Sequence, residues 1–220
     1  MIVGREKEQR ELLELLDKEE SQFCAVYGRR RVGKTYLIRE TFNYNFCFQH
    51  TGVAKGTLRQ QLTAFRNSLV AAGMMKCAIP KTWIEAFEQL KQLIKNAPAG
   101  KKILFIDELP WMDTPKGNLI GALENFWNGW CNDHDNVMLV VCGSATTWML
   151  KYLSRNKGGL YGRLTDEIKV YPFTLKECED YFDHENIELS RYDIVQSYMV
   201  FGGIPYYLSY FRKGYSFERL

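Results

Sequence analysis

Short apolar runs and amphipathic stretches follow one another along most of the chain. Five short runs, each bounded by charged or turn-forming residues, predict β-strands at residues 22–28, 46–50, 101–107, 137–144 and 166–173. Between them, apolar residues recur with helical spacing, which predicts helices at residues 5–20, 35–42, 57–73, 83–97 and 117–131. In the first of these helices, we expect the leucines to form the buried side, namely Leu12, Leu13, Leu15 and Leu16.

The strand pattern stops at about residue 173. A glycine-rich link at 157–163 leads into the last strand, and residues 175–184, 193–201 and 205–211 then predict three short helices. Because strands that alternate with helices form βαβ units, the fold class is α/β with a mainly parallel five-stranded sheet, followed by a small helical subdomain. We expect a core at residues 1–173 and a helical subdomain at 174–220 that continues in a longer natural protein.

Composition narrows the class of protein only slightly. A chain of 220 residues that is 46% hydrophobic can bury one ordinary core, and a net charge of +3 indicates neither a nucleic-acid nor a membrane partner. The six cysteines are widely spaced, which favours reduced thiols, and Cys24 and Cys142 lie in apolar runs where we expect burial. Neither a leader nor an apolar run of about 18 residues is visible, so we expect a soluble, cytoplasmic protein without a membrane partner.

Aromatic residues and histidines add no separate site. Trp127 and Trp130 fall on an apolar helix face and are expected in the core. His50, His134 and His184 share no common spacing, so we interpret them as solvated or hydrogen-bonded single residues.

The first candidate site is the stretch YGRRRVGKT at residues 27–35. Gly28, Gly33, Lys34 and Thr35 match the GxxxxGK[ST] (Walker A) pattern, and the stretch lies between a predicted strand and a predicted helix. Glycines allow the loop to curl so that backbone N–H groups and the N-terminus of the following helix face one phosphate. Lys34 would then bind the outer phosphates and the Thr35 hydroxyl would bind Mg²⁺.

The three arginines of this loop have an open role. They occupy variable positions of the pattern and need not touch a nucleotide, although one of them could bind phosphate. We count Arg31, Val32 and the following Tyr36 among the expected nucleotide-binding residues.

The second candidate site is the acidic pair that ends ILFIDEL (a Walker B pattern). Asp107 at the tip of an apolar strand would hold Mg²⁺, and Glu108 would polarise an attacking water. A turn acid and a capping acid are the respective alternatives. Pro110 is expected to keep this segment a loop, because a residue before proline avoids helical conformation. A strand between this one and the strand of the phosphate loop is expected, and 137–144 fits that place.

Two further residues are candidates for catalysis. Ser144 would lie at the adjacent strand tip, where its hydroxyl could contact the γ-phosphate or the water, with a helix N-cap as the alternative. Arg163 could stabilise charge that develops during phosphoryl transfer, from the same chain or from another, or it could be a solvated loop residue.

Taken in order, six segments resemble the archaeal-type ATPase family within the STAND class of P-loop NTPases, which are relatives of AAA+ proteins. The segments are VGREKE (3–8), YGRRRVGKT (27–35), LFIDELPWM (104–112), VVCGSATTWM (140–149), GGLYGRLTDEIKVYPF (158–173) and FGGIPYYL (201–208). The resemblance implies a P-loop NTPase core with three α/β/α layers, ATP or ADP and Mg²⁺ as cofactors, and further C-terminal domains. It also implies that Val3, Gly4 and Arg5 lie near the base and ribose, and that Pro205 closes over adenine. From the residues alone, these positions could equally be a helix N-cap and a helix-to-helix turn.

Several functions remain open at this point. The first hypothesis is a Mg²⁺-dependent ATPase that acts as a nucleotide-driven conformational switch for output domains, with ATP preferred over GTP by resemblance only. The alternatives are a regulatory module that binds nucleotide with negligible hydrolysis, a DNA-acting ATPase, and a small-molecule kinase, which the adjacent acids and the lack of an arginine-rich lid disfavour. Self-association or a protein partner could act through the C-terminal domains, whereas dispersed basic residues give no support for DNA binding.

Overall fold

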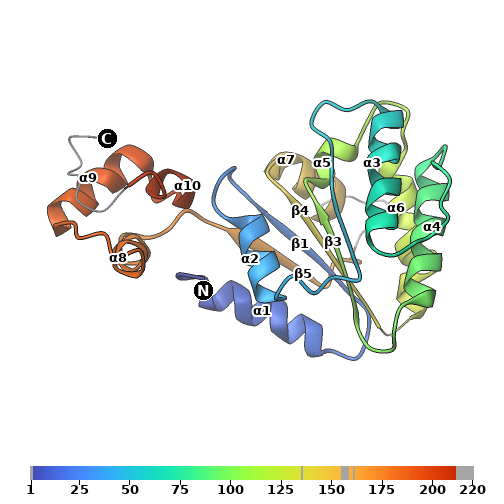
Figure 1. Cartoon of the computed structure of the whole chain (residues 1–220), viewed down its shortest axis with the longest axis horizontal. Coiled ribbons are helices and arrows are strands. Elements are labelled where there is room, and N and C mark those ends of the chain that lie inside the picture. The colour runs from blue at the N-terminus through green and yellow to red at the C-terminus, as the bar shows by residue number, and fades with distance from the viewer. Residues whose placement is uncertain (1, 135, 155–158, 161, 212–220) are drawn as a thin grey trace.

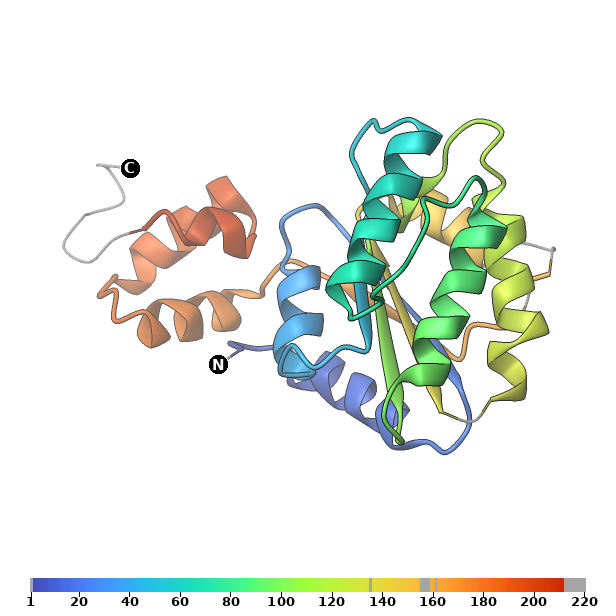
Figure 2. The ribbon, with the colours of Figure 1, turned by 45° about the vertical axis from the view of Figure 1, so that its right-hand side comes forward.

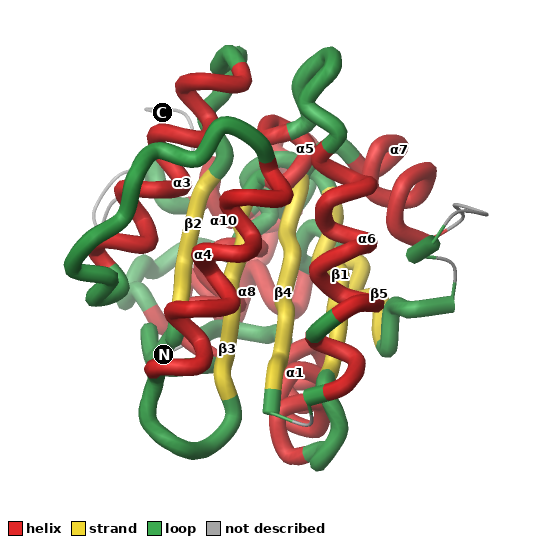
Figure 3. The backbone as a smooth tube through the Cα atoms, turned by 90° about the vertical axis from the view of Figure 1, so that its right-hand side faces the viewer, coloured by secondary structure: helices red, strands yellow, loops and turns green. Residues whose placement is uncertain are grey.

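The central feature of the fold is a five-stranded sheet in which every pair of neighbouring strands is parallel (Figures 1 and 3). A computed structural model describes residues 2–134, 136–154, 159–160 and 162–211. The strands are arranged in the order β2-β3-β4-β1-β5. Their bounds are β1 Gln22–Gly28, β2 Phe48–Thr51, β3 Lys102–Asp107, β4 Val137–Gly143 and β5 Asp166–Val170.

Strand β4 lies between β1 and β3, as the sequence predicts. Tyr27 pairs with Gly143, and Ile106 pairs with Val141, so the carboxyl ends of these three strands meet at one edge of the sheet. The phosphate loop follows β1 and the acidic pair ends β3, which brings both to that edge.

Helices cover both faces of the sheet (Figure 2). One face packs against α3, α4 and α6, and the other packs against α1 and α2. Side chains alternate accordingly along β3, where Leu104 and Ile106 belong to the first interior and Ile103 and Phe105 to the second. The bounds are α1 Glu6–Asp17, α2 Lys34–Thr41, α3 Leu58–Ala71, α4 Trp83–Asn96 and α6 Leu119–Gly129. The predicted α/β/α arrangement is therefore confirmed.

Three helices after the sheet form a separate apolar cluster, which extends to one side of the core in Figure 1. They are α8 Leu175–His184, α9 Arg191–Phe201 and α10 Pro205–Leu208. Thr174 and Ser190 begin α8 and α9 with capping boxes, in which each side chain accepts a hydrogen bond from the backbone three residues later. The last residues of the predicted helical subdomain, 212–220, lie outside the described residues.

A backbone contact fixes α10 beside the end of the sheet. The Phe173 N–H donates to the Gly203 carbonyl at 2.7 Å, and a Cβ on Gly203 would lie 2.1 Å from the Phe173 carbonyl oxygen. Gly203 also has φ +67°, so both the conformation and the close approach require glycine at this position.

The expectation that residues after Asp107 form a loop is wrong. Helix α5 occupies Leu109–Met112, with Pro110 in its first turn, where proline lacks only an N–H that has no helical partner. Glu108, between β3 and α5, adopts the left-handed conformation (φ 47°, ψ 47°), and this residue turns the chain from the strand into the helix.

Two other differences from the sequence-based expectations lie in the segment after β4 and within α1. The segment after β4 contains a short helix, α7 (Thr146–Met149), and a π-helical turn, η2 (Leu150–Ser154), which the sequence did not predict, and a 3₁₀ turn, η1 (Cys131–Asp133), follows α6. In α1, Leu12 and Leu15 are buried but Leu13 is 43% exposed, because it lies about 100° around the helix from Leu12.

Buried polar and sulfur-bearing residues agree only partly with expectation. Cys24 and Cys142 are fully buried, as expected, and all six cysteines are free thiols. His50, however, is neither solvated nor fully hydrogen-bonded, because it is 4% exposed and its Nε2 has no partner among the described residues. Within the described part of the chain, no helix has the length and apolar character needed to cross a bilayer.

Candidate functional site

The phosphate loop lies at the carboxyl edge of the sheet, between β1 and α2. Arg31 and Gly33 have left-handed backbones (φ 72° and 90°) and flank Val32, whose φ is negative. Such alternation turns successive N–H groups toward one side and forms an anion-binding concavity. A Cβ on Gly33 would have no atom within 4 Å, so the space beside this residue is open to a ligand. The loop geometry therefore fits a phosphate group.

Lys34 closes the loop from within. Its ammonium donates to the carbonyls of Gly28 and Arg29 at 3.1 and 3.0 Å, and the residue is only 6% exposed. The side chain is buried because α2 begins at Lys34 and directs it back under the loop. The buried charge lies beside the space where phosphate would bind.

Thr35 and Asp107 form the best candidate for a metal site. The Thr35 hydroxyl donates to Asp107 Oδ2 at 2.8 Å, and Asp107 is 5% exposed. One hydroxyl and one carboxylate are hard oxygen ligands, and Mg²⁺ commonly takes one or two protein oxygens together with waters and substrate phosphates. The residues present therefore fit Mg²⁺.

Glu108 and Ser144 lie next to this pair. Glu108 Oε2 accepts hydrogen bonds from both the backbone N–H and the hydroxyl of Ser144, at 3.2 and 3.1 Å. Glu108 makes no capping hydrogen bond to α5, and the N-cap of α7 is Ala145 and not Ser144. Neither residue therefore acts as the helix cap that was its alternative, and Ser144 orients the Glu108 carboxylate.

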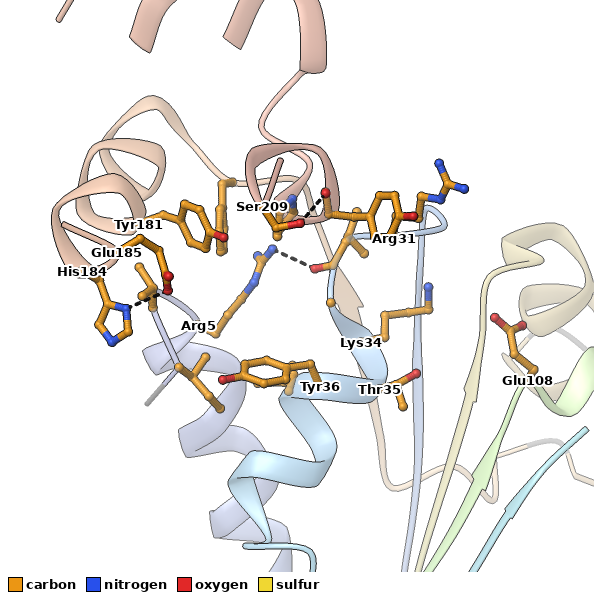
Figure 4. Close-up of a pocket in the computed structure, with 18 residues that line it drawn as sticks. Arg5, Arg31, Lys34, Thr35, Tyr36, Glu108, Tyr181, His184, Glu185 and Ser209 are labelled. Atoms are coloured by element: carbon orange, nitrogen blue, oxygen red, sulfur yellow. Dashed lines mark hydrogen bonds and ion pairs between the residues drawn. The ribbon is translucent and has the colours of Figure 1, made fainter. Parts of the chain in front are cut away.

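A pocket of about 580 Å³ joins these groups to helices α8 and α10 (Figure 4). At one end lie Lys34, Thr35 and Glu108, and at the other end lie aromatic and apolar side chains together with His184 and Glu185 (Figure 4). The lining residues are Ile2, Val3, Arg5, Arg31, Val32, Gly33, Lys34, Thr35, Tyr36, Leu37, Glu108, Phe173, Tyr181, His184, Glu185, Pro205, Tyr206 and Ser209. A pocket with Lys34 and Thr35 at one end and aromatic rings at the other end suits a nucleotide, whose phosphates are charged and whose base is flat and largely apolar on its faces.

The end of the pocket beside α8 carries two tyrosines and a carboxylate. Partial burial raises the pKa of Tyr36, and the nearby Glu40 and Glu185 carboxylates add to the effect. Burial also raises the pKa of Tyr181, again with Glu185 as the next cause. His184 Nδ1 and Glu185 Oε1 lie 3.2 Å apart, so this end of the pocket has hydrogen-bonding groups at its rim.

The Arg5 side chain does not cap helix α1, although the residue immediately precedes that helix. Its guanidinium donates to the backbone carbonyls of Val32 and Tyr171 at 3.4 and 2.5 Å and lies 4.8 Å from the centre of the Phe173 ring. Arg5 is the N-cap residue of α1 by position, but it makes no side-chain capping bond. It therefore ties the phosphate loop to the end of β5 and forms one wall of the pocket.

Comparison of the sequence with known protein families gives the same class of protein as this geometry. A family described as "ATPase domain predominantly from Archaea" matches residues 2–211. The chain belongs to this family.

Relatives of this archaeal ATPase family extend the comparison. An uncharacterized protein of Methanocaldococcus jannaschii is 27% identical over 208 residues, which cover 94% of this chain and 43% of the relative. The Walker-type ATPase PABY2304 of Pyrococcus abyssi has a similar fold, with a TM-score of 0.65, 20% identity and coverage of 94% of this chain and 65% of the other. The chain thus spans less than half of the first relative and less than two thirds of the second.

Two archaeal structures with lower similarity share the fold. The Orc1 protein of Aeropyrum pernix, solved in complex with DNA, has a TM-score of 0.54 and 19% identity over 84% of this chain and 49% of its own. The Orc2 protein of the same organism, solved with ADPNP and ADP, has a TM-score of 0.59 and 13% identity over 90% and 57%. Together with the family, these neighbours establish a P-loop ATPase fold of the nucleotide-binding class.

Three residues expected at the site do not line the pocket. Gly28 ends β1, where a Cβ would come 2.2 Å from the Val170 carbonyl oxygen, so this glycine allows β1 and β5 to approach, and its carbonyl accepts a hydrogen bond from the Lys34 ammonium. Gly4 faces the Glu177 side chain, 2.7 Å from where a Cβ would be. Arg163 is exposed and precedes β5, whose first residue pairs with Cys24, so it lies toward the amino ends of the strands and outside the pocket.

The sequence also missed part of the lining. Tyr181 and His184 come from α8 and Glu185 is the residue after it, whereas Tyr206 and Ser209 come from α10 and the residue after it. No local spacing could have found them, because their place depends on how the three C-terminal helices pack against the core.

Proposed function

We propose that the chain binds ATP with Mg²⁺ in this pocket and hydrolyses it slowly, as the nucleotide-handling part of a conformational switch. The observation that carries this proposal is the Thr35–Asp107 hydrogen bond of 2.8 Å, beside which Lys34 and Glu108 line the same pocket. A phosphate-binding loop, a metal-binding pair and a candidate general base are the parts that phosphoryl transfer to water requires.

Each part has a distinct role in the proposal. The amides of the loop and the Lys34 ammonium bind the phosphates, while Thr35 and Asp107 supply oxygen ligands to the metal. Bound Mg²⁺ would neutralise charge on the phosphates. Glu108, held by Ser144, accepts a proton from the attacking water or orients it by hydrogen bonding.

The opposite end of the pocket would hold the base and ribose. Val3, Tyr36 and Pro205 line this pocket and would contact them, and Arg5 supports the loop from the side. Adenine is expected because of the family to which the chain belongs. Arg163 has no role in this pocket under the proposal.

The switch part of the proposal concerns residues 174–220, which we assign as a helical subdomain beside a core of residues 1–173. Because α8 and α10 line the pocket, ligands that differ in phosphate number can contact them differently, and only such a difference can shift a conformational equilibrium. As the resemblance to the STAND class implies, this shift would act on output domains.

Glu108→Gln tests the hydrolysis part. We expect ATP affinity to stay within about twofold while phosphate release falls by about 10²–10⁴, since the amide keeps the hydrogen bonds but cannot take a proton. Asp113→Asn is the matched control, because Asp113 lies on the same edge and accepts from Trp148 Nε1 at 2.8 Å but does not line the pocket. If the wild type binds ATP and neither variant changes a negligible rate, the nucleotide is a structural ligand and the hydrolase assignment is wrong.

A further inference from the structure

The three consecutive arginines of the phosphate loop are not equivalent. Among the described residues, the side chains of Arg29 and Arg30 have no hydrogen-bonding, ionic or ring partner, whereas Arg31 has several. The Arg31 guanidinium lies 4.3 Å from the centre of the Tyr206 ring and 5.4 Å from that of Tyr207, and it donates to Tyr207 Oη at 3.0 Å. One arginine of the loop is thus bound to helix α10.

This contact lies on the wall of the nucleotide pocket. Arg31 and Tyr206 both line the pocket, together with Ser209 from the residue after α10 (Figure 4). Tyr210 Oη donates to Tyr206 Oη at 2.8 Å, so the ring that faces Arg31 is itself held by the turn that follows α10. The phosphate loop and the last helix therefore meet directly across the space proposed for the ligand.

We propose that Tyr206 and Tyr207 are positioning residues that hold Arg31 and thereby keep α10 closed against the phosphate loop, so that this contact sets how fast nucleotide leaves the pocket. The inference rests on the proposed function, because it takes the pocket to be the nucleotide site. It gives the two tyrosines of the segment GGIPYYL (202–208) a role of their own, separate from that of its glycines and proline.

The other contacts of α8–α10 with the core explain why breaking this one would open the pocket without detaching the helices. The Phe173 N–H bonds to Gly203, and Arg5 stacks on Phe173 while it holds Tyr171. These contacts lie where the chain passes from β5 into α8. They remain when Arg31 releases the tyrosines, so they can act as a pivot while α10 moves away from the loop.

Arg31 could instead act by binding phosphate directly. The two possibilities differ in what the tyrosines do: a direct phosphate contact does not need them, whereas closure does. The Arg31 φ of 72° is shared by both, since it belongs to the loop conformation. Variants on the tyrosine side therefore decide between them.

The experiment measures release of a fluorescent ATP analogue from the full 220-residue chain by stopped-flow displacement with excess ATP. We expect Arg31→Ala and the double variant Tyr206→Leu/Tyr207→Phe each to speed release about three- to tenfold, which is the range for an exposed cation–π contact plus a charge-assisted hydrogen bond. Combining all three changes is expected to add less than twofold, because both sides remove the same contact. Arg31→Lys should restore part of the slow release.

Two matched controls accompany these variants. Arg59→Ala removes an exposed positive charge of α3, outside the pocket, and Tyr192→Leu removes a tyrosine of α9 that is 71% exposed and does not line the pocket. Both are expected to release the analogue at the wild-type rate. Hydrogen exchange without nucleotide gives a second readout, in which the amides of residues 206–210 should exchange faster in Arg31→Ala and in the tyrosine variant.

Five results would overturn the proposal. Fast release by Arg31→Ala with wild-type release by the tyrosine variant would assign Arg31 to phosphate binding alone. Equal acceleration by Arg59→Ala would show a general charge effect, and unchanged hydrogen exchange at α10 would show that the contact does not hold this helix. If the wild type binds the analogue but no variant alters release, only the closure role fails, whereas a wild type that binds no analogue refutes the proposed function as well.

Discussion

The Thr35 hydroxyl lies 2.8 Å from Asp107 Oδ2, although the two residues are 72 positions apart in the chain. The contact exists because β1 and β3 both end at the same edge of the sheet, with only β4 between them. Each residue alone has an ordinary structural explanation, a helix-start threonine and a strand-end acid. Their contact inside the sheet edge gives two oxygen ligands at the place where a phosphate loop needs a metal.

Asp107→Asn should uncouple nucleotide binding from Mg²⁺. We expect the gain in ATP affinity on adding Mg²⁺, measured by calorimetry against the same titration in EDTA, to fall at least about tenfold in the variant, because an amide is a poorer ligand than a carboxylate for a hard cation. Affinity in EDTA should be nearly unchanged. A variant whose Mg²⁺ dependence equals that of Asp113→Asn would show that Asp107 is not a metal ligand.

Lys34→Ala should weaken ATP binding without unfolding the chain. The ammonium now satisfies the carbonyls of Gly28 and Arg29, which water can reach in the variant because the loop borders the pocket. We expect ATP affinity to drop about 10- to 100-fold, as for the loss of a hydrogen-bonded charge, and the melting temperature to change by only a few degrees. Undiminished ATP affinity in a folded variant would contradict the site.

Ser144→Ala tests whether Glu108 must be held in place. The change removes one of the two hydrogen bonds that Glu108 Oε2 accepts, and the backbone N–H at 3.2 Å remains. We expect kcat to fall about tenfold with KM for ATP unchanged, and Ser144→Thr to recover most of the rate. A rise in KM at constant kcat would instead indicate that Ser144 binds the nucleotide.

Local sequence patterns located the phosphate loop and the acid at the end of β3, but not the rest of the residues that line the pocket. The phosphate loop depends on spacing within nine residues, and the acid at the end of β3 follows an apolar run, so both patterns are visible without a structure. The rule that a residue before proline avoids a helix failed at Leu109, because Glu108 adopts a left-handed conformation that already turns the chain. The preference of a single residue before proline for a non-helical conformation is weaker than the packing of α5 against β4.

The Arg31–Tyr207 contact joins residues 176 positions apart, and no periodicity or motif spacing encodes it. It depends on where α10 sits, which the backbone contact between Phe173 and Gly203 determines. The sequence shows that GGIP is unusual, but not that its second glycine is needed for close approach to a carbonyl 30 residues earlier. Long-range placement of small helices is therefore the part that sequence reasoning could not supply.

Gly203→Ala should destabilise the protein more than Gly202→Ala. Both glycines have left-handed backbones (φ 67° and 64°), so each alanine carries a conformational cost of about 1 kcal/mol. At Gly203 the added Cβ would also lie 2.1 Å from the Phe173 carbonyl oxygen, whereas at Gly202 it would meet no atom within 4 Å. We expect urea unfolding to show a further loss of about 1–3 kcal/mol for Gly203→Ala only. Equal losses would mean that α10 can shift away from Phe173 without cost.

His50 should make the fold sensitive to acid. The ring is 4% exposed, its Nδ1 pairs with Ser68 Oγ at 2.9 Å, and its Nε2 has no partner among the described residues. Burial lowers the pKa of His50 from 6.5 to about 4. The unfolded chain therefore takes up a proton at a higher pH than the folded chain, and stability is lost as the pH falls from about 6.5 to about 4 and levels off below that window.

Between pH 7 and pH 5 this single group should lower the free energy of unfolding by about 2 kcal/mol. In His50→Gln, which keeps a polar partner for Ser68 but cannot be protonated, the difference between urea unfolding at the two pH values should shrink by about that amount. Carboxylates titrate in both proteins and cancel in the comparison. His134→Gln serves as the control, because His134 has its ring beside Trp130 at the other end of the sheet and is not among the buried side chains. If wild type and His50→Gln lose stability equally on acidification, His50 is protonated in the folded state, and water or a rearranged ring must reach its Nε2.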